Sequence, residues 1–437
     1  MKSKFKLDVW GYITIALLGA YAIFLLYPML NLLRRSVYSP DGVFTLGYFS
    51  KFFGKKYYFG TLLNSLKVTL CTTVTTLLLG APLAYFFTMY KIKGNGVLRI
   101  LIILSSMSAP FIGAYSWILL MGRSGVVTTF LKDTFNIQGI NIYGFAGILV
   151  VLTLQLYPLV FLYVSGALKN IDQSLMEASL NLGCSGVKRF FSLIIPLVMP
   201  TILASSLLVF MRALADFGTP MLIGEGYRTF PVLIYNEFMG EVSGDDGFAA
   251  AISIIAIIIT ALIFMAQKHA SNKLAFTMNA LHPIEPKELK GVRGVLIHLY
   301  SYLVVGLSIV PQCYVIYTSF LKTEGLVFKD GYWLGSYRTA FSKMGSSIVN
   351  TFVIAGSALV VIAYLAVRRR NAATNTMDLI SMMPYIIPGS VIGIAMLICF
   401  NRPPLIISGT FLIMIVALVI RRLPYTIRSS VAILQQI

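Results

Sequence analysis

The chain has 437 residues, of which 57% are hydrophobic and 12% charged, and its mean hydropathy is +0.82. Soluble domains carry roughly 25% charged residues, so this composition excludes a soluble globular protein. Lys and Arg number 35 against 16 Asp and Glu. The basic residues stand in short runs between apolar stretches, which argues against a nucleic-acid-binding protein and for a protein of the lipid bilayer.

Ten apolar stretches are long enough to cross a bilayer, which takes roughly 20 mostly apolar residues. They predict an all-α polytopic membrane protein with spans at about 11–33, 61–89, 97–121, 144–168, 197–217, 248–266, 295–318, 347–367, 377–399 and 404–421. A cytoplasmic N-terminus puts 20 Lys and Arg in the cytoplasmic segments and 13 in the longer outer segments. We therefore expect a multi-pass protein of the cell (inner or plasma) membrane in that orientation.

The second half of the chain repeats the order of residues in the first. The corresponding pairs include Pro28 and Pro311, Asn64 and Asn350, and Pro158 and Pro424. Six spans precede the second copy, so both copies enter the membrane from the same side. This indicates two parallel repeats, one of six spans over 1–280 and one of four spans over 281–437. Two such halves commonly enclose a path along their shared axis, which points to transport.

The polar loop between the fourth and fifth predicted spans carries the most specific motif. Its Glu177-Ala178-Ser179 triplet is followed after three residues by Gly183 and, after nine more, by a Leu-Ile-Ile-Pro sequence that ends in Pro196. Glycine permits the positive φ that ends a helix, and proline is tolerated in the first turn of the next one.

We predict an elbow of two short helices over residues 172–196, with Asp172 or Ser174 as the N-cap of the first helix. The second helix is amphipathic, and Pro196 is expected to start the fifth span. The alternative interpretation is an ordinary interfacial helix-turn-helix that only joins two spans.

This loop resembles the EAA motif of the inner-membrane permeases of binding-protein-dependent ABC transporters. Ser179 replaces the second Ala of that motif, and the sequence before Pro196 reads L-x-I-P where the family has I-x-L-P. The fused two-copy arrangement and the stretch 210–241 resemble the double permeases of ferric-iron, thiamine and 2-aminoethylphosphonate importers, most of all the ferric-iron group.

The resemblance implies a permease subunit of an ATP-driven ABC importer. Glu177, Ala178, Ser179, Gly183 and Pro196 would belong to a coupling element that docks into a groove on cytoplasmic ATPase subunits. An extracytoplasmic solute-binding protein would deliver the solute, with ferric iron favoured. The sequence has no G-x-x-x-x-G-K-[ST] phosphate loop, so we expect no enzyme activity of its own, no catalytic residues and no cofactor. The isolated Cys and His residues predict no metal site.

Charged residues inside predicted spans are candidates for a translocation path, because charges in a bilayer are costly and often functional. Arg212 and Asp216 lie one helical turn apart at the outer end of the fifth span. We favour a structural ion pair between them, with contact to a solute as the alternative. Lys67 is expected to extend toward the membrane surface. The acidic outer residues are expected to form a solvated loop, or to contact a binding protein or a cation; they are Glu237, Glu241, Asp245 and Asp246.

Two further hypotheses compete with the importer. An ion-coupled secondary carrier needs buried carboxylates, and only Asp216 and Asp378 lie in or at the edge of a predicted span. A truncated, non-transporting fragment is the other, because the second copy stops at Ile437, the counterpart of Ile171, before a coupling loop of its own.

Overall fold

The computed structural model of the chain describes residues 18–108, 110–137, 139, 141–240, 246–273, 282, 284–324, 327–343, 345–346, 349, 380, 383–384, 387–403, 405–410 and 412–421. Several positions used above lie outside these residues: Glu241, Asp245, Asn350, Asp378 and Pro424, with nearly all of the predicted span 347–367.

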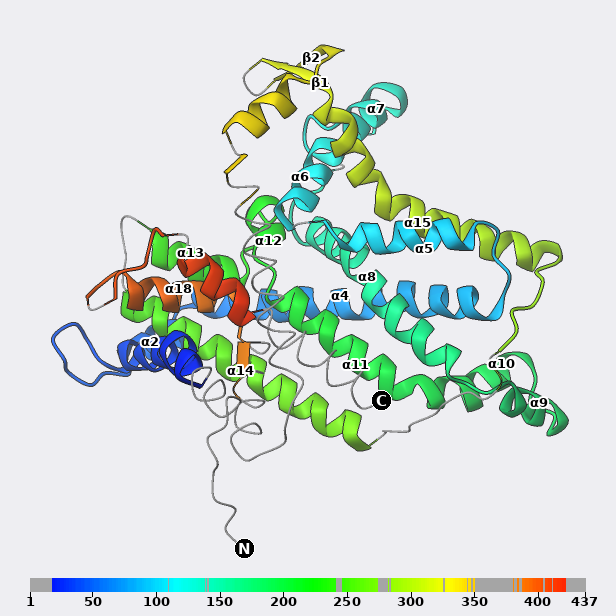
Figure 1. Ribbon diagram of the computed structural model, residues 1–437, viewed down its shortest axis with the longest axis horizontal. Coiled ribbons are helices and arrows are strands. Elements are labelled where there is room, and N and C mark those ends of the chain that lie inside the picture. Colours follow the sequence, from blue (N-terminus) through cyan, green and yellow to red (C-terminus); the bar gives the residue numbers. More distant parts are fainter. Residues whose placement is uncertain are drawn as a thin grey trace, which may run out of the picture. The chain divides into compact units, whose positions relative to one another are not determined.

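The described residues are mostly helical, which confirms the predicted class (Figure 1). The helices are η1 (Ala22–Leu26), α2 (Tyr27–Val37), α3 (Gly47–Gly54), α4 (Lys56–Met89), α5 (Asn95–Ser106), α6 (Pro110–Met121), α7 (Val126–Phe135), α8 (Phe145–Lys169), α9 (Gln173–Asn181), α10 (Gly186–Arg189), η2 (Phe190–Ile194), α11 (Ile195–Leu214), α12 (Gly218–Ile223), α13 (Phe230–Met239), α14 (Asp246–Lys273), α15 (Gly291–Ser319) and α18 (Gly389–Phe400). One antiparallel hairpin, β1 (Leu321–Glu324) with β2 (Val327–Tyr332), was not predicted.

Five helices among the described residues are long and apolar enough to cross a membrane. They are Lys56–Met89, Phe145–Lys169, Gly186–Leu214, Asp246–Ala266 and Gly291–Ser319, and each overlaps a predicted span. The predicted span 97–121 is instead broken: α5 and the segment Phe111–Phe135 are inclined at 104°. Pro110 begins α6 after the break, where a residue without an N–H costs little. The predicted spans 377–399 and 404–421 contain the shorter helices Gly389–Phe400 and Leu412–Arg421.

Two π-helical turns each end two positions before a proline. In α2 and α11 the second residue is Pro28 and Pro196, respectively, and each helix continues a π-turn, η1 or η2. A proline lacks the N–H that would bond four residues back, and its ring clashes with that carbonyl. The wider π-turn makes room for the proline ring and removes the need for the missing hydrogen bond. The expectation that Pro196 starts the span is therefore wrong, because α10, η2 and α11 form one continuous helix over Gly186–Leu214.

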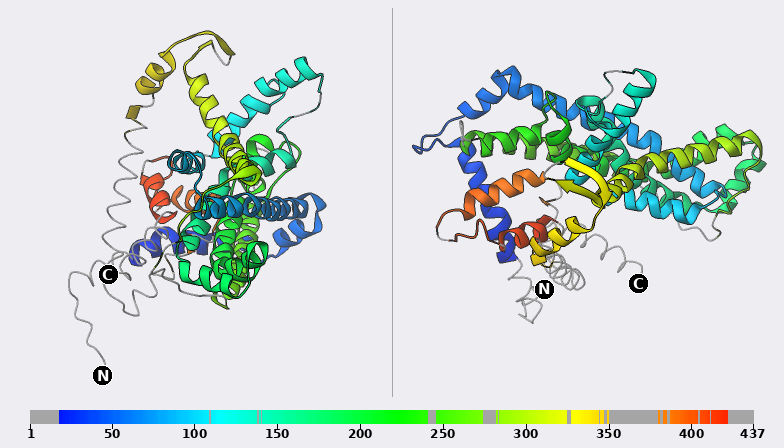
Figure 2. Two further views of the ribbon diagram at one scale, coloured as in Figure 1. Left: turned by 90° about the vertical axis from the view of Figure 1, so that its right-hand side faces the viewer. Right: turned by 90° about the horizontal axis from the view of Figure 1, so that it is seen from above.

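The chain divides into two compact units. Unit 1 comprises Met1–Phe59, Leu233–Ala261 and Leu334–Ile437, and unit 2 comprises Gly60–Val232 and Leu262–Trp333. In unit 1, α2 packs on α18 (Figure 2), and the ring of Phe24 lies 5.5 Å from that of Phe400. Arg35 forms an ion pair of 2.7 Å with Asp246, a member of the acidic outer group. The predicted repeats rest on sequence correspondence and stay a prediction.

Unit 2 is built around α8, which packs on α5, α6, α11 and α15. Its Tyr157 and Phe161 are fully buried. Figure 1 shows α5 lying beside α15. Helix α4 approaches α8 closely at Gly80, where an added Cβ would lie 2.8 Å from the Tyr157 carbonyl oxygen and from Val160 Cβ. Only glycine permits this distance between the two helices.

We expect Gly80→Ala to destabilise unit 2, because the methyl group must push α4 away from the backbone of α8. Overpacking of this kind costs about 1–3 kcal/mol. Gly60→Ala is the matched control in the same helix: nothing lies within 4 Å of its Cβ position, and replacing a helical glycine gains about 0.5–1 kcal/mol. Thermal unfolding in detergent measures both. Equal midpoints for the two variants would show that the contact at Gly80 is not tight.

Candidate functional site

The first helix of the predicted elbow is present at the end of α8 as α9 (Figure 1). The second is not a separate short helix: α10 is the start of the continuous helix Gly186–Leu214. Asp172 is the N-cap of α9: its backbone is extended, and Oδ1 accepts a hydrogen bond of 2.9 Å from the Ser174 N–H. A carboxylate at this position also interacts favourably with the positive end of the helix. Of the two residues predicted for the cap, Asp172 therefore fills the role.

Gly183 ends α9 in the left-handed conformation, with φ at +75°. The Cys184 N–H donates to the Ser179 carbonyl at 2.8 Å, and the Gly183 N–H donates to the Leu180 carbonyl at 2.9 Å. These two bonds define a Schellman motif, which satisfies carbonyls that the helix itself leaves unpaired. The predicted helix end at Gly183 is thus confirmed, and the chain reverses there into α10.

The Glu177-Ala178-Ser179 triplet presents two faces. Glu177 and Ala178 are exposed, whereas Ser179 is buried and its hydroxyl donates to the Met176 carbonyl at 2.7 Å. Glu177 accepts a hydrogen bond of 3.1 Å from Gln173, and none of the ion pairs formed by the described residues involves it. Glu177 therefore presents an exposed negative charge at the groove that Arg189 and Lys287 also line.

Large apolar side chains are exposed on both sides of the Gly183 turn. Leu182 is 83% exposed, Val187 73% and Phe191 64%. Leu182 lies on the loop, whereas Val187 and Phe191 lie in the first turns of the apolar helix Gly186–Leu214. Exposed apolar residues gathered in this way are typical of a surface that a partner or lipid covers. The sequence motif did not indicate this group, although the apolar residues of the second helix could have suggested it.

Residues 284–290 with His282 form a strap that holds the elbow to the end of α4. The His282 N–H donates to Asp172 Oδ2 at 3.0 Å, and the His282 carbonyl accepts from the Gln173 N–H at 2.9 Å. Further along, the Lys287 carbonyl accepts from the Lys91 N–H, and the Lys287 N–H donates to the Met89 carbonyl, both at 2.9 Å. Sequence reasoning missed the strap because most of these bonds are between backbone groups.

Arg212 and Asp216 are not brought together. Helix α11 ends at Leu214, so Asp216 no longer lies one turn above Arg212 on the same helix. Asp216 Oδ1 instead accepts a hydrogen bond of 2.9 Å from the Thr219 N–H in α12, and Arg212 is exposed. Four ion pairs form among the described residues, and Arg212–Asp216 is not one of them. The predicted pair is wrong because a single helix does not carry both residues.

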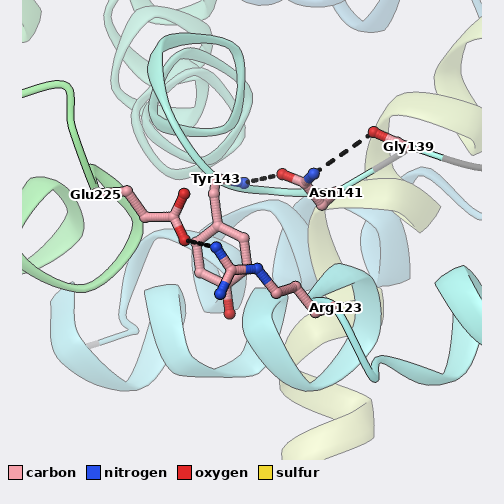
Figure 3. Close-up of polar contacts among 5 residues, drawn as sticks. All are labelled: Arg123, Gly139, Asn141, Tyr143 and Glu225. Atoms are coloured by element: carbon pink, nitrogen blue, oxygen red, sulfur yellow. Dashed lines mark hydrogen bonds and ion pairs between the residues drawn. The ribbon is translucent and has the colours of Figure 1, made fainter.

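The other end of α8 carries a polar cluster that the sequence did not indicate. Figure 3 shows Arg123 Nη2 bonded to Glu225 Oε1, 2.6 Å apart, with the guanidinium 5.3 Å from the centre of the Tyr143 ring. Asn141 accepts from the Tyr143 N–H at 3.0 Å. Glu225 has a positive φ of 46°, a backbone conformation that residues other than glycine rarely adopt. The ion pair links the α6–α7 connection to the loop after α12, and no local sequence pattern joins residues 102 positions apart.

Lys67 also lies near this end of α8. Its ammonium group stands 4.9 Å from the centre of the Phe145 ring, a cation–π contact. The charge predicted to extend toward the membrane surface thus has a defined aromatic partner at the start of α8.

Comparison with known proteins places the chain among transport components. Residues 69–275 match the family "Binding-protein-dependent transport system inner membrane component". The ferric transport system permease protein FbpB of Actinobacillus pleuropneumoniae is 28% identical over 430 residues, covering 95% of this chain and 62% of that relative. The spermidine/putrescine transport system permease protein PotB of Haemophilus influenzae is 30% identical over 273 residues, covering 60% of this chain and 94% of that relative.

A solved structure shows a similar fold. The structure of a bacterial alginate ABC transporter in complex with alginate pentasaccharide-bound periplasmic protein contains a chain with a TM-score of 0.53 and 15% identity. The likeness covers 61% of this chain and 95% of that chain. At this identity it concerns the arrangement of helices alone.

We expect Asp172→Ala to loosen the elbow, since it removes the N-cap of α9 and leaves the His282 N–H without its acceptor. Loss of a cap costs about 1 kcal/mol. Hydrogen exchange measures this directly: the amides of Ser174 and His282 should exchange faster, while those of α4 keep their protection. Asp172→Asn keeps one acceptor oxygen and replaces the other by an NH2 group, so it can retain only one of the two bonds and should speed exchange at one of the two amides. Unchanged exchange at both amides in Asp172→Ala would contradict the assigned bonds.

Proposed function

Because this chain belongs to the family of binding-protein-dependent transport system inner membrane components, we propose that it is a permease subunit that couples solute passage to ATP hydrolysis by a partner. The single observation that carries this proposal is the elbow over 172–196, a capped helical hairpin that exposes Glu177 on α9 and apolar side chains around the Gly183 turn. A hairpin fixed at both ends of α9 can transmit a force, whereas an unstructured loop cannot.

The docking surface on the elbow combines charge with apolar area. Glu177 offers a negative charge to a basic partner, and Leu182, Val187 and Phe191 offer apolar contact. Interfaces with an apolar centre and charged edges are typical of specific protein–protein contacts. The proposed partners are cytoplasmic ABC ATPase subunits, which would place the elbow and the N-terminus in the cytoplasm.

The elbow is connected to two predicted spans. The helix Gly186–Leu214 continues from the elbow into a span without a break, so displacement of α10 moves that span. The strap joins the start of α9 to the end of α4. ATP-driven motion of the partner would therefore reach two spans at once, and solute passage would follow from their rearrangement.

We further propose ferric iron as the solute, delivered by an extracytoplasmic solute-binding protein. The likeness to a ferric transport permease over 95% of this chain supports it, and the chain spans 62% of that relative's length. The Arg123–Glu225 cluster at the far end of α8 from the elbow is on the side where such a protein would dock. Arg212 and Asp216 stay candidates for the translocation path.

The coupling role is tested with Glu177→Lys. Reversing this exposed charge should reduce stimulation of the partner ATPase by the chain at least tenfold, because like charges at an interface are repulsive. Co-purification of the ATPase and its hydrolysis rate are the measurements. Asp133→Lys makes the same charge change at an exposed position of α7 and should leave both unchanged. Normal stimulation by Glu177→Lys would refute the assigned surface.

The solute is tested in proteoliposomes that hold the chain, the ATPase and the binding protein. ATP-dependent accumulation of radioactive ferric iron, with no competition by spermidine, is the expected result. Competition by spermidine would favour a polyamine permease. Accumulation that needs an ion gradient and no ATPase would instead identify a secondary carrier.

A further inference from the structure

A cavity of about 280 Å³ lies beside the elbow in unit 2, and the proposed function makes no use of it. Two cationic side chains, Arg99 and Lys169, line it together with the polar Thr88 and Asn95. Apolar wall comes from Phe87 and from Ile284 of the strap. Ile284 also lines the groove between α9 and the strap, so the cavity adjoins the elbow.

Arg99 is held firmly in this cavity. Its Nε donates to Asn95 Oδ1 at 2.7 Å, and Nη2 donates to the Phe87 carbonyl at 3.2 Å. A longer bond of 3.4 Å joins Nη1 to Ser165. The guanidinium carbon lies 5.6 Å from the ring centres of both Phe87 and Phe161, which adds cation–π attraction. These bonds use three of the five N–H groups of the guanidinium, so two N–H groups form no hydrogen bond to the described residues, and Arg99 lines the cavity.

No carboxylate balances this charge among the described residues. None of those that line the cavity is acidic, and neither Arg99 nor Lys169 takes part in an ion pair there. Three acids lie nearby. Asp172 accepts two backbone N–H groups, Glu288 lies 3.8 Å from Lys91, and Glu285, between Ile284 and Pro286 in the sequence, lines the neighbouring groove with Arg189 and Lys287 and not the cavity. Arg99 is half-buried and Lys169 is exposed. The two cations line one space and repel each other, a cost that a bound anion would remove.

The start of α5 strengthens the attraction for an anion. Asn95 is the first residue of this 12-residue helix, and the N-terminus of a helix carries a partial positive charge. The cavity therefore combines a fixed guanidinium, an ammonium group and a helix N-terminus. Planar guanidinium groups bind phosphate oxygens in pairs, and lysine adds a point charge.

We propose that this cavity binds a phosphate-bearing anion. The volume admits a phosphate with a few attached carbon atoms, and Phe87 and Ile284 provide apolar contact for those carbons. Two sources share this chemistry: the headgroup of an anionic phospholipid, which basic pockets between spans on the cytoplasmic side are suited to bind, and a free phosphate. The ligand would rest on α5, α8 and the strap at once, and would fix the strap against the spans.

Binding to the purified full chain in detergent tests the proposal without reference to transport, so its failure and that of the proposed function are distinguishable. The probes for isothermal titration calorimetry are short-chain phosphatidylglycerol, phosphatidylcholine of the same chain length, and inorganic phosphate. We expect saturable binding of phosphatidylglycerol, inorganic phosphate or both, with phosphatidylcholine at least tenfold weaker than phosphatidylglycerol.

Three variants assign the binding to this cavity. Arg99→Gln and Lys169→Gln should each weaken it at least tenfold. The Lys169 side chain is exposed, so Lys169→Gln should fold normally. It therefore tests the site even if Arg99→Gln fails to fold because the Arg99 hydrogen bonds are lost. Lys93→Gln removes an exposed cation on the α4–α5 connection, outside the cavity lining, and should bind as the wild type does.

The outcomes separate the two sources. Saturable binding of phosphatidylglycerol alone identifies a lipid headgroup, and saturable binding of inorganic phosphate identifies a free phosphate; both support the site if Lys169→Gln weakens them. No saturable binding of either probe overturns the proposal. Binding that Lys169→Gln and Lys93→Gln change equally, or phosphatidylcholine binding as tight as that of phosphatidylglycerol, overturns it as well.

Discussion

The Asp172 carboxylate is the interaction on which the elbow depends. One oxygen caps α9 through Ser174, and the other holds the strap through His282. The first N–H groups of a helix have no partner within the helix. In α9 the His282 carbonyl of the strap accepts from Gln173, and the Asp172 carboxylate accepts from Ser174. A single acidic residue therefore has two structural roles. It caps the start of α9, and it binds the strap between α14 and α15 to the elbow.

The same requirement explains where this chain departs from regular helices. Backbone groups in a bilayer must be satisfied within the protein, so each interruption carries a compensating device. Pro28 and Pro196 follow π-turns, Gly183 closes α9 with two backbone bonds, and Asp216 satisfies the Thr219 N–H in α12. The backbone groups at the ends of α9 are thus satisfied, which the proposed coupling role requires.

Sequence reasoning succeeded where a single residue type determines local geometry. Asp172 and Gly183 mark the ends of α9 because a cap needs an acceptor and a left-handed turn favours glycine. It failed where the outcome depends on distant segments or on helix length. The strap is held mainly by backbone bonds, which no side chain signals, and the Arg123–Glu225 pair joins residues from separate loops. Arg212 and Asp216 were paired on the assumption that α11 reaches residue 216, but it ends at Leu214.

The strap separates two electrically different spaces. On one side is the groove, where Glu177 and Glu285 are matched by Arg189 and Lys287. On the other is the cavity with Arg99 and Lys169 and no acid among its described lining residues. Ile284 faces both. An anion in the cavity and an ATPase on the elbow would thus act on one short segment. If docking shifts the strap, the two binding events must change each other's affinity by the same factor, since such coupling is reciprocal. The phosphate-bearing anion would then set how readily the elbow moves, and the inner leaflet or the cytoplasm would influence transport without touching the solute path.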